Sequence, residues 1–275
     1  MDEMVIEAGR AEAHYWRDLW RYRDLFIFLA WRDLLVRFKQ TVFGVLWAVL
    51  RPLFTMAIFV VIFGRVAGLP SGGVPYPILV LGGMLPWQFF SAALSDASNS
   101  LVANGNLISK IYFPRIILPA SSVIVSLVDF AITLLMMALV MAWYGFMPPA
   151  RIVLLPLFVA LALAAAFGPG LIATALNVKY RDFRFLIPFV VQFGLYVSPV
   201  GFKSSVVEEK LGAFARLVYA LNPMVGVIDG FRWSIGAEQS LHVPSLLMSV
   251  GTTVAMLMLG VRFFRRTEKG FADIV

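Results

Sequence analysis

The segment IVLLPLFVALALAAAFGPGLIATAL, residues 152–176, contains no charged residue, and NVKYRDFRFLIP, residues 177–188, follows it directly. A helix formed by the first segment is long enough to cross a hydrocarbon layer about 30 Å thick, at about 1.5 Å per residue. The second segment places four charged residues within six positions before the chain becomes apolar again: Lys179, Arg181, Asp182 and Arg184. This alternation of a long apolar block with a short charged loop is typical of a membrane protein.

The composition of the whole chain supports the same interpretation. Of its 275 residues, 60% are hydrophobic and 14% are charged, whereas soluble domains average about 45–50% apolar and about 25% charged residues. The sequence therefore predicts an all-α integral membrane protein with a single transmembrane domain, residues 1–275. We expect six spans, of which the fifth is short: 42–63, 78–102, 116–143, 152–176, 185–200 and 245–261.

The positions of lysine and arginine predict the orientation, because cytoplasmic loops retain these residues. With the N-terminus inside, 16 of the 23 basic residues lie on the cytoplasmic side, six lie outside, and Arg51 lies within the first span. Both termini are therefore predicted to be cytoplasmic. The polar N-terminus lacks the basic-then-apolar pattern of a cleaved signal peptide, so we expect Met1 to remain.

Residues 22–40 precede the first span and show a different pattern. At about 100° per residue, one apolar stripe appears on a helix through this segment. The stripe consists of Ile27, Trp31, Leu34, Leu35 and Phe38. Away from it lie Arg32, Asp33, Arg37 and Lys39. An interfacial helix in the membrane plane fits this pattern, and the alternative is a helix packed on a cytosolic domain.

The outer segment between the last two spans is also unusual. Residues 214–236 are too apolar for a solvated loop and are interrupted at Asn222-Pro223 and at Gly226. We expect two short helices to meet there, within an outer helical hairpin of residues 205–236. Two further spans are the alternative, but neither half approaches the roughly 20 residues that a span needs.

Several kinds of chemistry are excluded by what the sequence lacks. There is no cysteine, and the two histidines, His14 and His242, are predicted on opposite sides of the membrane, so neither residue type supplies a metal site. No Gly-Lys dipeptide occurs, so the chain has no Walker phosphate loop and any nucleotide energy must come from a partner. The net charge of +7 comes from residues at the ends of apolar blocks, which argues against a nucleic-acid partner.

Three ionisable residues lie within the predicted spans, where charged groups are costly and face protein or water. They are Arg51, Asp96 and Asp129. One interpretation makes the two carboxylates a proton relay. We favour a structural pairing, for which Arg51 is the candidate partner, because each aspartate is isolated among apolar neighbours.

Two short loops on the predicted cytoplasmic side, 103–119 and 177–185, mix basic and aromatic residues. The positive-inside rule explains the basic residues but not the tyrosines and phenylalanines. Exposed aromatic residues beside arginine are common anchors of protein interfaces. Both loops are therefore candidate docking sites for a protein partner.

Four segments of the chain carry a resemblance to a known family. They are RYRDLFIFLAWRDLLVRFKQTVFGVLWAVLRPL (21–53), NLISKIYFPRIILP (106–119), NVKYRDFRFLIPFVVQFGLYVSPV (177–200) and ALNPMVGVIDGFRWSIG (220–236). In this order and spacing they resemble the membrane permease subunit of type-2 ABC exporters of bacterial polysaccharides. The similarity extends from about residue 20 to the last span.

This resemblance implies a half-transporter of the bacterial cytoplasmic (inner) membrane. Such a subunit forms a homodimer among the membrane lipids and binds two copies of a separate ABC ATPase, which hold ATP and Mg while this chain binds no cofactor. The substrate would be O-antigen, capsule or teichoic-type polymer attached to a lipid.

The resemblance also assigns roles to residues of this chain. The ATPase-coupling residues would be Asn104, Lys110, Tyr112, Phe113, Arg115, Lys179, Tyr180, Arg181, Asp182 and Phe183. The interfacial gate helix would use Trp31, Arg32, Arg37, Phe38 and Lys39. The translocation path would involve Trp47, Arg51, Phe54, Trp87, Phe90 and Tyr196. The outer gate would include Asn222, Pro223, Asp229 and Arg232.

Three alternatives remain open at this point. A type-2 permease for a small lipid or drug would share the topology. A proton-coupled carrier would use Asp96 and Asp129. A membrane enzyme would need clustered polar catalytic groups at one interface, and the sequence shows no such cluster.

Overall fold

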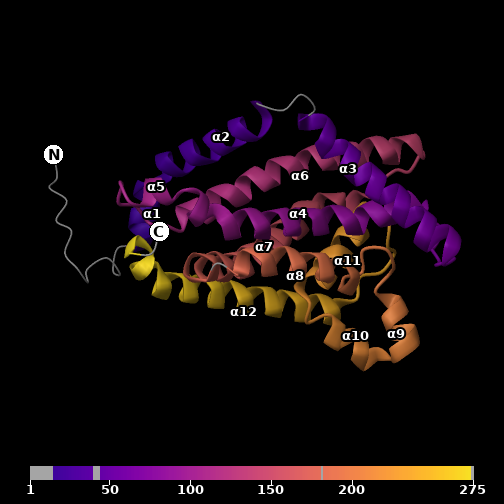
Figure 1. Ribbon diagram of the computed structural model, residues 1–275. Coiled ribbons are helices and arrows are strands. Elements are labelled where there is room, and N and C mark those ends of the chain that lie inside the picture. The colour runs from indigo at the N-terminus through magenta and orange to yellow at the C-terminus, as the bar shows by residue number, and fades with distance from the viewer. Residues whose placement is uncertain (1–14, 40–43, 181, 274–275) are drawn as a thin grey trace.

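The computed structural model describes residues 15–39, 44–180 and 182–273. Within these residues the chain consists of helices and connecting turns, without β-strands. Figure 1 shows the long helices lying side by side in one bundle. The predicted all-α class is confirmed.

The α-helices range in length from the 4 residues of α5 to the 28 residues of α4. In chain order they are α1 Tyr15–Arg21, α2 Arg23–Lys39, α3 Gly44–Phe59, α4 Tyr76–Ala103, α5 Gly105–Ile108, α6 Ile117–Trp143, α7 Leu155–Lys179, α8 Phe183–Val197, α9 Ser205–Leu211, α10 Ala213–Tyr219, α11 Pro223–Ile235 and α12 Val243–Thr267. A π-helical segment, Val60–Val66, continues α3, and 3-10 helices form at Ala150–Leu154 and Glu268–Asp273.

Among the described residues, five helical segments are long and apolar enough to cross a membrane. They are Val49–Val66, Tyr76–Ala103, Ile117–Trp143, Ala150–Lys179 and Val243–Thr267. They correspond to the predicted spans one to four and six, although residues 42 and 43 of the first lie outside the described residues. Helix α8 is apolar but has 15 residues, which reach about 22 Å, so a sixth span stays a prediction.

Local chemistry explains where several helices begin and end. A proline stands at the first or second position of α4, α7, α11 and α12, where its missing N–H costs nothing. Asn222 caps α11, because its side-chain oxygen accepts a hydrogen bond from the N–H of Met224 at 3.0 Å. Gly236 ends α11 with a φ of 87°, a backbone conformation that favours glycine.

The outer segment differs from the prediction in two ways. The interruption at Asn222-Pro223 is confirmed, but Gly226 lies inside α11 rather than at a break. A Cβ at Gly226 would lie 2.5 Å from the Cβ of Ser249, so glycine there serves close packing of α11 on α12. The two expected short helices are α10 and α11, and the hairpin of residues 205–236 contains a third helix, α9, which packs on α10, while α11 is buried against α4, α7 and α12.

Helix α4 lies at the centre of the bundle, packed against both α6 and α7. It contributes the largest share of the main apolar core, which also contains residues of α6, α7 and α11. Helices α3 and α8 contribute little to this core. Among the residues of α8, only Ile187 is buried, and only 6% of the span through α3 is buried.

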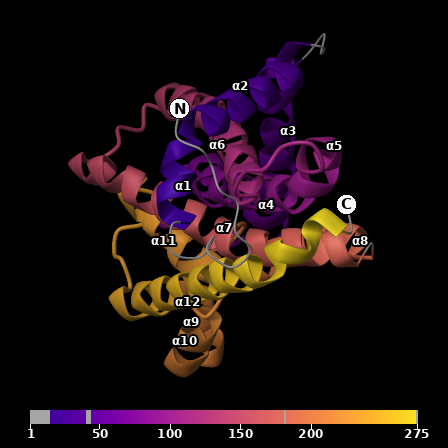
Figure 2. The same cartoon turned by 90° about the vertical axis from the view of Figure 1, so that its left-hand side faces the viewer.

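A second apolar cluster lies at one end of the bundle. It combines residues of α2, the 108–118 segment, the C-terminal half of α7 and the chain beyond α12, such as Leu29, Ile108, Val178 and Phe271. In Figures 1 and 2, α1, α5 and the end of α12 gather at this end, and Figure 1 shows α9 and α10 at the other. The segments predicted to share one side of the membrane therefore lie together.

Candidate functional site

A cavity of about 710 Å³ with both polar and apolar lining residues lies among α2, α3, α4, α6 and α8. Its polar lining consists of Arg37, Arg51, Thr55, Gln88, Ser91, Ser95, Asp96, Ser126, Asp129, Thr133 and Gln192. Its aromatic lining consists of Phe38, Trp47, Trp87, Phe89 and Phe130. Hydroxyl, amide and charged groups beside aromatic rings can bind a polar ligand that has apolar faces, such as a sugar.

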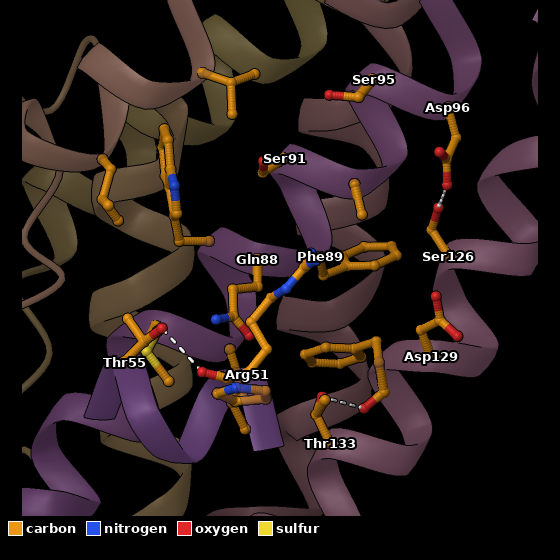
Figure 3. A pocket seen from close by; sticks show the side chains of 18 of the residues that line it. Arg51, Thr55, Gln88, Phe89, Ser91, Ser95, Asp96, Ser126, Asp129 and Thr133 are labelled. Atoms are coloured by element: carbon orange, nitrogen blue, oxygen red, sulfur yellow. Dashed lines mark hydrogen bonds between the residues drawn. The ribbon is translucent and has the colours of Figure 1, made fainter. Parts of the chain in front are cut away.

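The polar lining of α4 comes from its helical period. Gln88, Ser91 and Ser95 recur at intervals of three and four residues and therefore share one face of α4, and Asp96 lies about 100° around the helix from Ser95, at the edge of that face. Figure 3 shows these side chains along the cavity, with the hydroxyl of Ser126 on α6 pointing at Asp96. The sequence prediction missed Gln88, Ser91 and Ser95, although their spacing would have identified them.

Arg37 of α2 joins three helices at the edge of this cavity. Its Nη1 lies 2.9 Å from Oδ2 of Asp96 on α4, and its Nη2 lies 2.8 Å from Oδ2 of Asp129 on α6. Ser126 donates a further hydrogen bond to the same oxygen of Asp96 at 2.8 Å. The expected structural pairing of the two aspartates is thus present, but its partner is Arg37 and not Arg51.

Helix α2 turns polar residues toward the protein along its C-terminal half and exposes an apolar stripe, while Leu29 is buried in the second apolar cluster. Arg32 donates from Nη2 to Oδ1 of Asn104 at 2.8 Å and pairs with Asp33 at 2.7 Å. A second cavity of about 520 Å³ follows this polar side and shares Arg37 and Asp96 with the first. On the apolar side, Trp31 is 58% exposed. Exposure of this ring to water would be unfavourable, whereas its contact with a bilayer interface would be favourable.

The other residues predicted for this helix fall on either side of that division. Phe38 is half-buried and lines the first cavity. Lys39 ends α2 and is exposed. The predicted contrast between an apolar stripe and a polar stripe is therefore present, and Phe38 marks its inner edge.

The predicted path residues divide into two groups. Trp47, Arg51 and Trp87 line the cavity. Phe54 and Tyr196 do not, because their helices turn them outward, where both are more than half exposed. Phe90 packs its ring 5.3 Å from that of Trp87 and supports the wall from behind.

The first predicted coupling loop presents a mixed surface. Lys110, Ile111 and Tyr112 are exposed, whereas Phe113 is 4% exposed and belongs to the second apolar cluster. Asn104 caps the loop by donating to the carbonyl of Ser100 at 2.9 Å while it accepts from Arg32. Phe113 and Asn104 therefore shape the loop, and Ile111, which the sequence prediction missed, is part of its exposed surface.

Arg115 closes the same loop. Its backbone N–H donates to Oε1 of Glu268 at 2.5 Å, and its guanidinium donates to the main-chain oxygen of Glu268. A residue predicted to contact a partner protein is thus engaged by the chain's own C-terminal segment. No pattern in the sequence identifies Glu268 as its partner.

The second predicted loop is the more exposed one. Lys179, Tyr180 and Asp182 are exposed, and Phe183 is half-buried with its ring 6.2 Å from that of Tyr180. The Nζ of Lys179 lies 5.1 Å from the centroid of the Tyr180 ring. Arg181 lies outside the described residues.

Two of the four residues predicted for the outer gate, Asp229 and Arg232, are buried polar residues, and the other two, Asn222 and Pro223, are half-buried. Arg232 is fully buried and donates to the carbonyl oxygens of Leu79, Phe202 and Val200 at 3.0, 2.7 and 2.7 Å. Asp229 is also buried and accepts from Ser204 at 2.5 Å.

Asn222 completes the contacts of this region. It donates to the hydroxyl of Ser198 at 3.0 Å, and Pro223 follows it as the first residue of α11. The cluster therefore fixes α11 against the turn that follows α8.

Comparison with known families identifies this arrangement. The ABC-2 type transporter family profile matches residues 24–235, from α2 through α11. The chain belongs to the ABC-2 type transporter membrane family. The match covers the cavity, both predicted coupling loops and the outer cluster, but it ends before α12 and the C-terminal segment.

Individual relatives extend over most of this ABC-2 type chain. The O-antigen export system permease protein RfbA of Myxococcus xanthus is 26% identical over 261 residues, covering 94% of this chain and 98% of that protein. A protein of the same name from Klebsiella pneumoniae is 26% identical over 253 residues, with coverage of 92% and 95%. The polysialic acid transport protein KpsM of Escherichia coli is 22% identical over 239 residues, with coverage of 86% and 91%.

Proposed function

We propose that this chain is the transmembrane subunit of an ATP-driven exporter that moves a lipid-linked polysaccharide, such as O-antigen or capsule, across the bacterial inner membrane. The carrying observation is the cavity lined by hydroxyls, amides and aromatic rings within an otherwise apolar bundle. A proton or a purely apolar substrate would not need such a lining. The relatives named for O-antigen export and polysialic acid transport support a polysaccharide substrate.

The subunit works with a separate ATPase. The chain has no Gly-Lys dipeptide and therefore no Walker phosphate loop of its own. ATP and Mg would instead be bound by the partner ATPase subunit, of which two copies would be present. The exposed surfaces around Tyr112 and Tyr180 are the proposed contacts. ATP binding can shift the membrane subunit between states only if the two subunits bind differently in those states.

The proposed topology has six spans and cytoplasmic termini. The gathering of α1, α5 and the end of α12 at one end of the bundle supports this topology. Helix α8 would be the fifth span. It would be short because Arg232 binds the carbonyl oxygens of the turn after Val197 and so holds that turn inside the protein. Helix α2 would lie at the cytoplasmic interface, and α9 to α11 would form the outer gate.

We further propose a homodimer. Helices α3 and α8 flank the cavity, yet most of their residues are uncovered. Contact between lipid and the polar side chains of these helices, such as Arg51 of α3 and Gln192 of α8, would be energetically unfavourable. A second copy across α3 and α8 would enclose the cavity and supply the other half of a path.

Arg37 argues against the proton-carrier alternative. A proton carrier needs carboxylates that exchange protons during transport, whereas Asp96 and Asp129 share a guanidinium that keeps its charge. Their arrangement fits a structural ion-pair network better.

The proposal is tested in a strain that lacks this gene. We expect complementation to restore the surface glycan, measured by immunoblot of intact cells, and to require the ATPase subunit. Purified in nanodiscs, the chain alone should not hydrolyse ATP, and the complex should. Drug or short-lipid export without glycan export would favour the small-substrate alternative, and transport without nucleotide would contradict the proposal.

A further inference from the structure

Glu268, just beyond α12, connects three parts of the chain that are distant in sequence. Its Oε1 accepts the hydrogen bond from the backbone N–H of Arg115 at 2.5 Å, and its Oε2 accepts one from the hydroxyl of Tyr15 at 3.0 Å. Arg115 ends the first predicted coupling loop, and Tyr15 begins α1. One carboxylate therefore joins the loop, the N-terminal helix and the C-terminal turn.

Aromatic packing holds this carboxylate in place. Phe264 and Phe271, on either side of Glu268, are fully buried, with their rings 5.5 Å apart. Both belong to the apolar cluster that includes Phe113 of the coupling loop and Leu29 of α2. The C-terminal turn is thus docked between the loop and the interfacial helix.

The charges around Glu268 fit a fixed carboxylate. Burial raises the pKa of Glu268, while the hydrogen bonds from the Arg115 backbone and the Tyr15 hydroxyl, together with the guanidiniums of Arg115 and Arg265, lower it. Arg265 lies over the ring of Tyr15, with its guanidinium carbon 4.6 Å from the ring centroid. A half-buried carboxylate with two donors and two nearby cations has little freedom to move.

The contact also has a route to the cavity. Helix α1 ends at Arg21 and α2 begins at Arg23, so α1 and α2 follow each other with one residue between them. At its far end α2 carries Arg37, which pairs with Asp96 and Asp129 at the cavity edge. A displacement of α1 would therefore reach the wall of the cavity through a continuous helical segment.

We propose that Glu268 is a positioning residue that makes the 104–116 loop and the α1–α2 segment move as one body. This inference rests on the proposed function, in which the loop receives the motion of the ATPase. The C-terminal turn would then transmit that motion to the interfacial helix. The loop would have a second mechanical output besides the two spans, α4 and α6, that it connects.

A distance measurement tests the connection directly. Spin labels can be attached at Ser109→Cys in the loop and Arg17→Cys in α1, which are both exposed positions. No native cysteine competes for the label, because the chain has none. In the assembled complex we expect a narrow distance distribution that is the same with and without ATP. Glu268→Ala should broaden it or make it depend on ATP, and an unchanged distribution in Glu268→Ala would overturn the proposal.

Matched variants separate positioning from folding. Glu268→Gln keeps an oxygen for the Arg115 N–H and offers an N–H to Tyr15, so it should stay close to wild type. Tyr15→Phe removes one hydroxyl and serves if Glu268→Ala does not assemble. Arg266→Ala, exposed and two residues away, is the control and should behave as wild type.

Transport gives the second readout. We expect Glu268→Ala to keep ATP hydrolysis by the complex but to lower surface glycan export per ATP at least about threefold, the size of a typical lost coupling contact. Unchanged export per ATP would contradict the proposal. If the wild-type complex itself exported no glycan, the proposed function would fail instead, and the distance measurement would still decide whether Glu268 joins the two segments.

Discussion

Two arginines show how differently one residue type can serve in this chain. Arg232 is fully buried and donates to three main-chain carbonyls of two separate segments. Arg37 is partly exposed and pairs with two aspartates at a cavity edge. The buried guanidinium of Arg232 is held by all three carbonyls at once. The ion pairs of Arg37, by contrast, can break by rotation of the Arg37 side chain alone. Arg232 is therefore suited to a fixed role and Arg37 to a movable one.

Replacing Arg232 tests the fixed role. Arg232→Met would remove the donors for Leu79, Val200 and Phe202 and the cation beside the buried Asp229. We expect a loss of about 3–5 kcal/mol in the free energy of unfolding, because a buried carboxylate would remain uncompensated. Thermal unfolding in nanodiscs measures it. Lys210→Gln, on exposed α9, should change stability by less than about 0.5 kcal/mol, and an equal loss in both would contradict this role.

Neutralising the Arg37 network tests the ion pairs. Arg37→Met leaves Asp96 and Asp129 facing each other, and we expect it to cost about 1 kcal/mol, because the pairs are partly exposed. The triple variant with Asp96→Asn and Asp129→Asn should lose less than the sum of Arg37→Met and the double Asn variant. Unfolding midpoints of the four proteins complete the cycle. Strictly additive losses would mean that the three residues do not interact.

The partners of these residues were only partly predictable from the sequence. Arg51, Asp96 and Asp129 stood out because charged residues are rare in spans. Their pairing did not, since Arg37 lies 59 residues from Asp96 and on a helix that the sequence assigns to the interface. Spacing along one helix identifies which side chains share a face, and it carries no information on which face of another helix they meet. Glu268 was missed for the same reason.

At the scale of helices, apolar length predicted most of the architecture. The spans near α4, α6, α7 and α12 agree with the sequence prediction to within a few residues at most ends. The outer segment was harder, because Gly226 can mean either a helix break or a close helix contact. Only the position of Ser249 on α12 distinguishes the two. The short fifth apolar segment was also predicted, and it forms α8 with 15 residues.

The contact between α7 and α12 depends on two glycines. A Cβ at Gly260 would lie 2.2 Å from the main-chain oxygen of Gly168, so the two backbones touch where they cross. Small residues at such crossings allow close helix packing in membranes. We expect Gly260→Ala to separate the helices and cost about 1–3 kcal/mol, measured by thermal unfolding. Gly251→Ala, on the same helix with open space around it, is the control and should not destabilise.

At the scale of the whole molecule, the distribution of exposed apolar surface separates lipid contact from subunit contact. Helix α12 exposes residues such as Leu247 and Leu259 on a helix that does not line the polar cavity, which suits contact with acyl chains. Helices α3 and α8 expose equally apolar residues but also border the cavity with Arg51 and Gln192. Lipid against those polar groups would be unfavourable. This distribution supports the proposal that a second copy of the chain packs on α3 and α8.

Single cysteines in this cysteine-free chain test that placement. Phe189 and Phe193 of α8 are exposed and stacked, with ring centroids 6.4 Å apart. Facing a second copy, Phe193→Cys should form cross-linked dimers on mild oxidation in native membranes, whereas Leu259→Cys on α12 should remain monomeric on denaturing gels. If the proposed copies separate along α8 to widen the path, the cross-link should also stop glycan export until it is reduced. Equal cross-linking at both positions would indicate random collision, and cross-linking at Leu259→Cys alone would move the dimer interface to α12.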